Sequence, residues 1–242
     1  MILFSKRSYR LLIMMLGVGL VTAEAIGQDW REFANFKHYA EANEAVPTKS
    51  DDQFRVVFMG DSITAVWPMF APHLFDNDRA INRGIGGQTT PQMLLRFKVD
   101  VLQLSPDAVV ILAGTNDLAG NAGDATIEEI AENIFSMAEL SVSAGVEVVI
   151  CSLLPAIDYV WSPGREPAPK IQALNKKLQA YSEEKGHYFV NYYDLLVDDL
   201  GGLQVPDYTS ATDLVHPNIT AYRLMEEALM PTLASLAGDV NK

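Results

Sequence analysis

The stretch RVVFMGDSIT, residues 55–64, decides how this chain folds. Its first half, Arg55 to Met59, is a short apolar run without polar alternation, which predicts a strand buried on both faces. Gly60 then allows a sharp turn out of the strand, so Ser62 is expected just beyond the strand's carboxyl end.

Four more short runs predict the remaining strands: residues 79–82, 107–113, 146–151 and 187–191. Amphipathic segments between them predict helices. The first opens at Thr90-Pro91 and has Leu94, Phe97, Val101 and Leu104 on one stripe, and the second opens at a capping box of Thr126 and Glu129. The third runs from Pro169 to Gly186. The last runs from Ile219 to about Leu236, with a break at Pro231. Such alternation predicts an α/β fold with a five-stranded parallel sheet covered on both sides. Ligands on these sheets bind beyond the carboxyl ends of the strands.

Ser62 is a candidate nucleophile, but a serine hydroxyl needs a neighbouring base. Of the four histidines, His216 is the candidate base because Asp213 lies three residues earlier and can fix its tautomer. The other three, His38, His73 and His187, are expected to be surface or packed residues, with His73 in a loop. Alone, Gly60-Asp61-Ser62 could be a strand-end turn or helix cap, and Asp213-x-x-His216 a structural turn or half a metal site.

Two further short motifs supply hydrogen-bond donors for a negatively charged oxygen. Asn116, in Gly114-Thr115-Asn116-Asp117, offers a side-chain N–H, and the loop from Asn82 to Gly87 offers a backbone N–H, with the Ser62 amide as a third donor. The glycine loop could also be read as a dinucleotide fingerprint, but Thr89 occupies the place of its third glycine. Nucleophile, base and donors together indicate acyl transfer.

These four motifs, at residues 60–62, 82–87, 114–117 and 213–216, resemble in this order the blocks of the SGNH, or GDSL, hydrolase family. The resemblance covers residues from about 54 to 235, with Ile63 in place of the family's leucine. The resemblance is closest to secreted bacterial esterases and platelet-activating-factor acetylhydrolase-like members. It implies a flavodoxin-like three-layer α/β/α sandwich and a serine esterase that needs neither metal nor cofactor. Carried over, the roles would be Ser62 as nucleophile, His216 as base, Asp213 as its partner, Asn116 as side-chain oxyanion donor, and Gly87 as backbone oxyanion donor, or Gly86 if the loop is shifted by one residue.

The amino terminus reads as an export signal. Basic residues precede an apolar run from Leu11 to Val21, and Ala23-Glu24-Ala25 fits a signal-peptidase site, so the mature chain is expected to start near Ile26. A retained membrane anchor is the alternative, although the run is shorter than the roughly 18 residues of a span. We therefore predict a signal peptide over 1–25, an N-terminal extension over 26–53 and a hydrolase domain over 54–238. A glycan on the sequon at Asn218 would crowd His216, which favours a bacterial periplasmic or extracellular protein.

Net charge limits the classes of molecule that the protein is expected to bind, and cysteine content indicates the state of its thiol. Removing residues 1–25 takes away three of 18 basic and one of 31 acidic residues, which changes the net charge from −13 to −15. Such a surface repels nucleic acid and anionic lipid, so neither is an expected partner. Cys151 is the single cysteine, lies in an apolar run, and is expected to be a buried, unreactive thiol.

The expected substrate is a small-molecule or polysaccharide ester with a short acyl group, often acetyl. After the fourth predicted strand, Tyr159 and Trp161 lie in a loop at the expected rim of the site, where they could stack on a sugar ring or only pack the loop. The alternatives are a lysophospholipase or thioesterase with the same residues, and a non-catalytic glycan-binding module that has kept the fold.

Overall fold

The computed structural model describes residues 29–50, 52–76 and 78–240. The predicted signal peptide lies outside the described residues. Within this part of the chain, no helix is both long and apolar enough to cross a bilayer.

Five parallel strands form the central sheet, in the order β2-β1-β3-β4-β5. The strands are β1 Val56–Gly60, β2 Ala80–Gly84, β3 Ala108–Leu112, β4 Glu147–Cys151 and β5 Tyr188–Val190. This is the flavodoxin-like strand order, and β1 sits between β2 and β3, where the order reverses. The predicted α/β fold and its five-stranded parallel sheet are confirmed.

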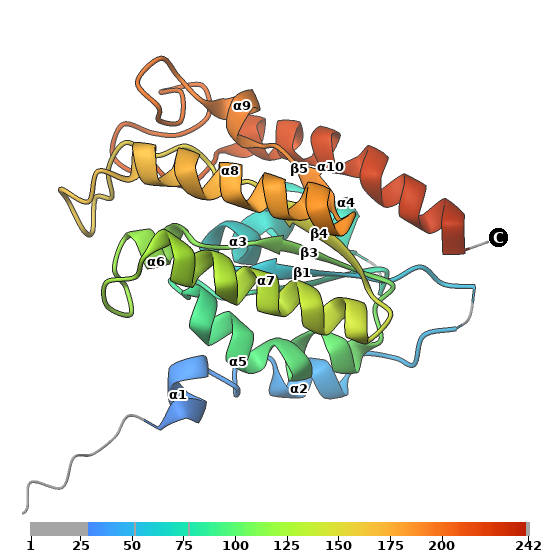
Figure 1. Ribbon diagram of the computed structural model, residues 1–242. Helices are drawn as coiled ribbons and strands as arrows, with labels where there is room; N and C mark the ends of the chain where they lie inside the picture. The colour runs from blue at the N-terminus through green and yellow to red at the C-terminus, as the bar shows by residue number, and fades with distance from the viewer. Residues whose placement is uncertain (1–28, 51, 77, 241–242) are drawn as a thin grey trace, which may run out of the picture.

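Helices cover both faces of the sheet (Figure 1). One layer consists of α5 Thr90–Asp100, α7 Ile127–Ser143 and α8 Pro167–Lys185, which pack residues such as Phe97, Ile134 and Leu174 against the sheet. The other face is covered by α3 Ser62–Phe70 and α10 Ile219–Val240, through residues such as Trp67 and Met225. Short helices complete the fold: α1 Trp30–Ala34, α2 Ala40–Glu44, α4 Pro72–Phe75, the 3-10 turn η1 Leu102–Leu104, α6 Thr115–Leu118 and α9 Tyr193–Leu196.

Three helix predictions need correction. The cap of α5 is Thr89, whose side chain forms a capping box with Gln92, so the helix begins at Thr90 itself. Helix α8 begins at Pro167, because a proline suits the first turn there as well as at Pro169. Helix α10 continues through Pro231, since its buried apolar residues hold it to the sheet despite the missing backbone donor. His73 lies in α4, not in a loop.

Candidate active site

Ser62, His216 and Asp213 form a continuous hydrogen-bonded line. The Ser62 Oγ lies 2.9 Å from His216 Nε2, and His216 Nδ1 lies 2.8 Å from Asp213 Oδ1. Asp213 Oδ1 also accepts the backbone N–H of His216 at 2.9 Å, so one carboxylate fixes both the ring and the main chain of the histidine. With the Nδ1 proton held by Asp213, Nε2 is free to accept the serine proton. The fold thus brings together three residues that the sequence analysis singled out from opposite ends of the chain.

Burial alone would raise the pKa of the Asp213 carboxyl, but the backbone and side-chain hydrogen bonds from His216, with its charge and the Val215 N–H, together hold that pKa below its ordinary value. Asp213 is therefore ionised at neutral pH. A charged carboxylate at this position can stabilise an imidazolium formed on His216.

Close packing places Ser62 at the start of α3. A methyl group on Gly60 would lie 2.1 Å from the Thr64 Oγ1, and one on Gly84 would lie 2.2 Å from the Ala65 backbone nitrogen. Only glycine therefore fits at the ends of β1 and β2, where α3 crosses them. Asp61 caps α3 by accepting the Ile63 N–H at 2.9 Å, which leaves Ser62 as the first helical residue.

The two candidate glycines differ in their surroundings. A methyl group on Gly86 would lie 3.8 Å from the Ser62 Cβ, so this residue lies beside the serine. Gly87 has φ of +76°, which favours glycine, and turns the chain away from β2. Among the described residues, neither backbone N–H donates to a protein acceptor. Both amides are thus available to a ligand, and Gly86 is the one that lies beside Ser62.

Asn116 lies in α6, after β3, and is buried beside Asp61. Its Nδ2 donates to the Asp61 Oδ2 at 3.3 Å and to the Gln88 carbonyl at 3.1 Å, while its Oδ1 accepts from Asn121 Nδ2 at 2.8 Å. This network fixes which end of the amide is the donor. The 3.3 Å bond is the weakest of the three, so that N–H is the one most easily turned toward a ligand.

The last residue of this block, Asp117, is also buried. It accepts the backbone N–H of Thr90 at 3.0 Å and its hydroxyl at 2.6 Å, and so satisfies the amino end of α5. Burial raises the pKa of Asp117, although the Thr90 hydrogen bonds oppose that rise. Its contacts tie the loop after β3 to α5.

Burial raises the pKa of the Asp61 carboxyl to about 6, from an ordinary value of 3.8, against the opposing effects of the Ile63 N–H and the nearby His216. The folded protein therefore binds this proton more tightly than the unfolded chain does, and wild-type stability falls as pH rises through this window.

We expect the free energy of unfolding of the Asp61→Asn variant, minus that of the wild type, to increase by up to about 3 kcal/mol as the pH rises from 4 to 7. Urea unfolding across this range measures the change, and any constant offset from the substitution cancels. Asp199→Asn, at an exposed aspartate, is the control and should give a flat difference. A flat difference for Asp61→Asn as well would contradict the raised pKa.

The two loop aromatics have different environments. Trp161 is 42% exposed, and its ring centroid lies 6.3 Å from that of His216, which places it at the mouth of the site. Tyr159 is 0% exposed and packs beneath Trp161, with 5.2 Å between ring centroids. The prediction that Tyr159 stacks on a sugar ring is therefore wrong, because the core covers its ring.

Asn121 joins the site although the sequence analysis missed it. Its Nδ2 donates to the Asn116 Oδ1 at 2.8 Å and to the Gly87 carbonyl at 3.1 Å, and its Oδ1 accepts from the Trp161 Nε1 at 3.0 Å. One exposed amide thus contacts both candidate oxyanion elements and the rim tryptophan. In the sequence, Asn121 is marked only by its place five residues after Asn116. It was missed because no general spacing rule predicts such a bridge.

The other candidate residues stay apart from this line. His38 packs on Tyr39, His73 pairs with Glu226, and His187 lies against Tyr181. Cys151 is buried, as predicted, and burial raises the pKa of its thiol to about 12. Within the described ranges, no three His, Cys, Asp or Glu side chains are grouped as metal ligands would be.

Comparison with known proteins decides the family. Residues 58–224 match the GDSL-like Lipase/Acylhydrolase family. The chain belongs to this family. The family is one of lipases and acylhydrolases, the class of enzyme that the sequence predicted.

Solved structures of this family are similar over nearly their whole length. A proposed acylhydrolase from Bacteroides fragilis is 40% identical, with a TM-score of 0.82 over 87% of this chain and 99% of that one. A GDSL-like lipase from Bacteroides thetaiotaomicron is 42% identical, with a TM-score of 0.80 over 84% and 98%. Human platelet-activating factor acetylhydrolase IB subunit alpha2 is 29% identical over 142 residues, 57% of this chain and 59% of that protein. The chain spans less than two thirds of the length of the curated relatives it matches first.

Proposed function

We propose that this GDSL hydrolase is a serine esterase that removes a short acyl group, acetyl in the first instance, from an oxygen ester on a carbohydrate. The observation that carries the catalytic part is the line from Ser62 through His216 to Asp213, with 2.9 Å and 2.8 Å between the bonded atoms. Nucleophile, base and orienting carboxylate are in contact before any substrate binds.

In this mechanism His216 Nε2 takes the Ser62 proton as the Oγ attacks the acyl carbon. The oxyanion receives the Ser62 and Gly87 backbone N–H groups, or that of Gly86, and an N–H of Asn116, which gives up its 3.3 Å bond to Asp61. His216 then protonates the leaving alcohol. In the second half His216 takes a proton from water as the water oxygen attacks the acyl carbon. It then gives that proton to the Ser62 Oγ as the bond between the acyl carbon and this oxygen breaks.

The carbohydrate part of the proposal rests on Trp161. This half-exposed indole lies next to His216 and its Nε1 is held by Asn121, so its orientation is fixed before binding. A fixed aromatic ring at the mouth of a site suits stacking on the apolar face of a sugar. The acidic chain, with net charge −13, suits a neutral polysaccharide better than an anionic lipid. The name of the human relative supports acetyl as the acyl group.

A substrate panel tests this proposal. It compares p-nitrophenyl acetate, butyrate and palmitate, acetylated xylooligosaccharide and pectin, lysophosphatidylcholine and acyl-coenzyme A, with the Ser62→Ala variant as blank. We expect the acetyl esters to have the highest kcat/KM, and Trp161→Ala to lower that of the oligosaccharide about tenfold more than that of p-nitrophenyl acetate. Preference for the palmitate, lysolipid or thioester would establish the lipid-type alternative. Binding of acetylated xylooligosaccharide without turnover of any ester would establish the glycan-binding alternative.

Export and the domain boundaries complete the proposal. We expect secretion with cleavage after Ala25, followed by the extension over 26–53 and the hydrolase domain over 54–238. Terminal sequencing of the protein from the periplasm or medium of an expressing bacterium measures this. A protein that keeps residues 1–25 in the membrane fraction would indicate an anchor instead.

We expect Asn121→Ala to lower kcat about tenfold with KM nearly unchanged, because the donors at Asn116 and Gly87 lose the side chain that orients both. Steady-state kinetics on p-nitrophenyl acetate measures this. Asn191→Ala, which removes another exposed asparagine with a side-chain hydrogen bond, is the matched control. Equal kcat for the two variants would remove Asn121 from the mechanism.

A further inference from the structure

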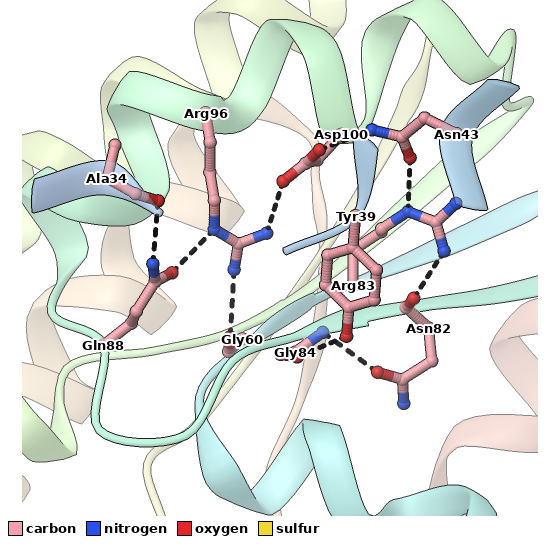
Figure 2. A network of polar contacts seen from close by, with 10 residues as sticks. All are labelled: Ala34, Tyr39, Asn43, Gly60, Asn82, Arg83, Gly84, Gln88, Arg96 and Asp100. Atoms are coloured by element: carbon pink, nitrogen blue, oxygen red, sulfur yellow. Dashed lines mark hydrogen bonds and ion pairs between the residues drawn. The ribbon is translucent and has the colours of Figure 1, made fainter. Parts of the chain in front are cut away.

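A buried polar network joins the segment before β1 to the glycine loop of the active site (Figure 2). This segment, Asp29–Val46, carries α1 and α2 and lies outside residues 58–224, the part of the chain that matches the family. The family match therefore assigns it no role. Its contacts fall on the residues at both ends of the loop that connects β2 to α5.

At the start of the loop, Tyr39 holds the last residue of β2. Its hydroxyl donates to the Gly84 carbonyl, and its ring lies 4.7 Å below the guanidinium carbon of Arg83. Burial raises the pKa of Tyr39, so the phenol keeps its proton and remains a donor. The backbone at the entrance to Gly86 and Gly87 is thus fixed by a side chain from the N-terminal segment.

At the other end, Gln88 is held on both sides of its amide. Its Nε2 donates to the Ala34 carbonyl at 3.0 Å, and its Oε1 accepts from the Arg96 Nε at 2.6 Å. The Gln88 carbonyl in turn accepts from Asn116, at 3.1 Å. Gln88 therefore connects the C-terminal end of α1 to the proposed oxyanion donor.

Arg96 and Asp100 are both buried and extend this network. Arg96 Nη1 pairs with Asp100 Oδ2 at 3.0 Å, and its Nη2 donates to the carbonyl of Gly60 at 3.4 Å, two residues before Ser62. Asn43 of α2 completes the circuit, since its Nδ2 donates to Asp100 at 2.6 Å and its Oδ1 accepts from Arg83 at 2.8 Å. A buried charge is costly without partners, so removal of the Asn43 side chain would take one partner each from Asp100 and Arg83.

The loop itself supplies only part of this order, through the Gln88 N–H, which donates to the Ile85 carbonyl. Gly86 and Gly87 have no side chains to pack, their N–H groups are left for a ligand, and glycine has the widest choice of backbone angles. Apart from the Asn121 side chain at the Gly87 carbonyl and the Ile85 N–H at the Gly60 carbonyl, such a loop is fixed from its ends. A small error in the direction of a backbone donor lowers transition-state stabilisation while leaving substrate binding almost unchanged.

We propose that the N-terminal segment Asp29–Val46 is a positioning element of the active site, and that Tyr39 and Gln88 set the direction of the oxyanion-binding amides from the two ends of the glycine loop. This inference rests on the proposed esterase mechanism. Substitutions in the segment should therefore change kcat, in addition to any change in the stability of the fold.

Tyr39→Phe is the first test, because it removes a single hydroxyl and keeps the ring under Arg83. The control is Tyr181→Phe, which removes another tyrosine hydroxyl that faces a backbone carbonyl, between α7 and α8. Active sites are counted by titration with a fluorophosphonate, and kcat and KM are measured with p-nitrophenyl acetate. The Kd of a phenylboronic acid, whose adduct with Ser62 would place an oxygen in the oxyanion site, is measured alongside.

We expect Tyr39→Phe to lower kcat about tenfold, to weaken boronic acid binding by a similar factor, and to leave KM within about twofold, whereas Tyr181→Phe leaves all three unchanged. Gln88→Met, compared with Gln179→Met on the exposed face of α8, should act in the same direction from the other end of the loop. A lower Tm with unchanged kcat and boronic acid affinity per active site would overturn the proposal. Failure of the esterase assignment would look different, since wild type and Ser62→Ala would then turn over ester equally or not at all.

Discussion

Ser62→Ala should lower kcat by about 10⁴-fold or more on p-nitrophenyl acetate, the largest effect that we expect from any substitution in this protein. The hydroxyl is the only group on the line to His216 that can form an acyl-enzyme, and His216 Nε2, 2.9 Å away, has no other proton to take at this point. The residual rate should come from the oxyanion donors and from binding alone. Because the variant lacks one oxygen atom, α3 and its cap at Asp61 should remain in place.

Ser143→Ala is the matched control, since it removes a hydroxyl that bonds a backbone carbonyl within the exposed end of α7. It should keep wild-type turnover. Trapping of a radiolabelled acyl group on the wild type and its absence from Ser62→Ala would complete the test. If Ser62→Ala turned over the ester at the wild-type rate, the nucleophile assignment would be wrong even though the distances are right.

The second largest effect should follow from His216→Ala, with kcat lower by about 10³- to 10⁴-fold. The substitution removes the proton acceptor of Ser62 and leaves the Asp213 carboxylate facing an empty position. External imidazole should restore part of the rate, because a small base can enter the space of the missing ring and use the same carboxylate. A pH–rate profile measured with and without imidazole checks this.

His73→Ala serves as the control, because its imidazole is exposed and pairs with Glu226 on the surface. It should have wild-type kinetics. Equal rates for His216→Ala and His73→Ala would show that the proton goes elsewhere. Loss of rate in His216→Ala with no response to imidazole at any pH would point to a structural role for the ring.

The sheet could be predicted because its signals are local. Each strand is a continuous apolar run, and Gly60 and Gly84 mark the strand ends at which only glycine fits beside α3. The order of the four blocks then placed Ser62 and Asn116 after neighbouring strands, since parallel strands end at one edge of the sheet. His216 could be selected because Asp213 lies within one turn of it.

The parts that sequence could not supply depend on long-range contacts. The apolar stripe predicted from Leu94 is correct for Phe97 within α5, and Val101 and Leu104 are buried just beyond the end of that helix. Arg96, also in α5, is fully buried as well. It can be buried because its guanidinium donates to the Gln88 side-chain amide, the Asp100 carboxylate and the Gly60 carbonyl, and the last of these lies 36 residues away in the chain. The choice between stacking on a sugar and packing the loop stayed open for Tyr159 for the same reason, since a loop aromatic becomes core only when other elements cover it. Asn121 reads as an ordinary loop residue until its three partners are in place.

The two atoms that share the catalytic proton belong to residues 154 positions apart, one following the first strand and the other preceding the last helix. A growing or partly folded polypeptide therefore has no reactive serine, because the imidazole arrives only when α10 docks. Esterase turnover then reports completed folding of the whole chain, and its recovery after denaturation should lag behind the return of helix signal.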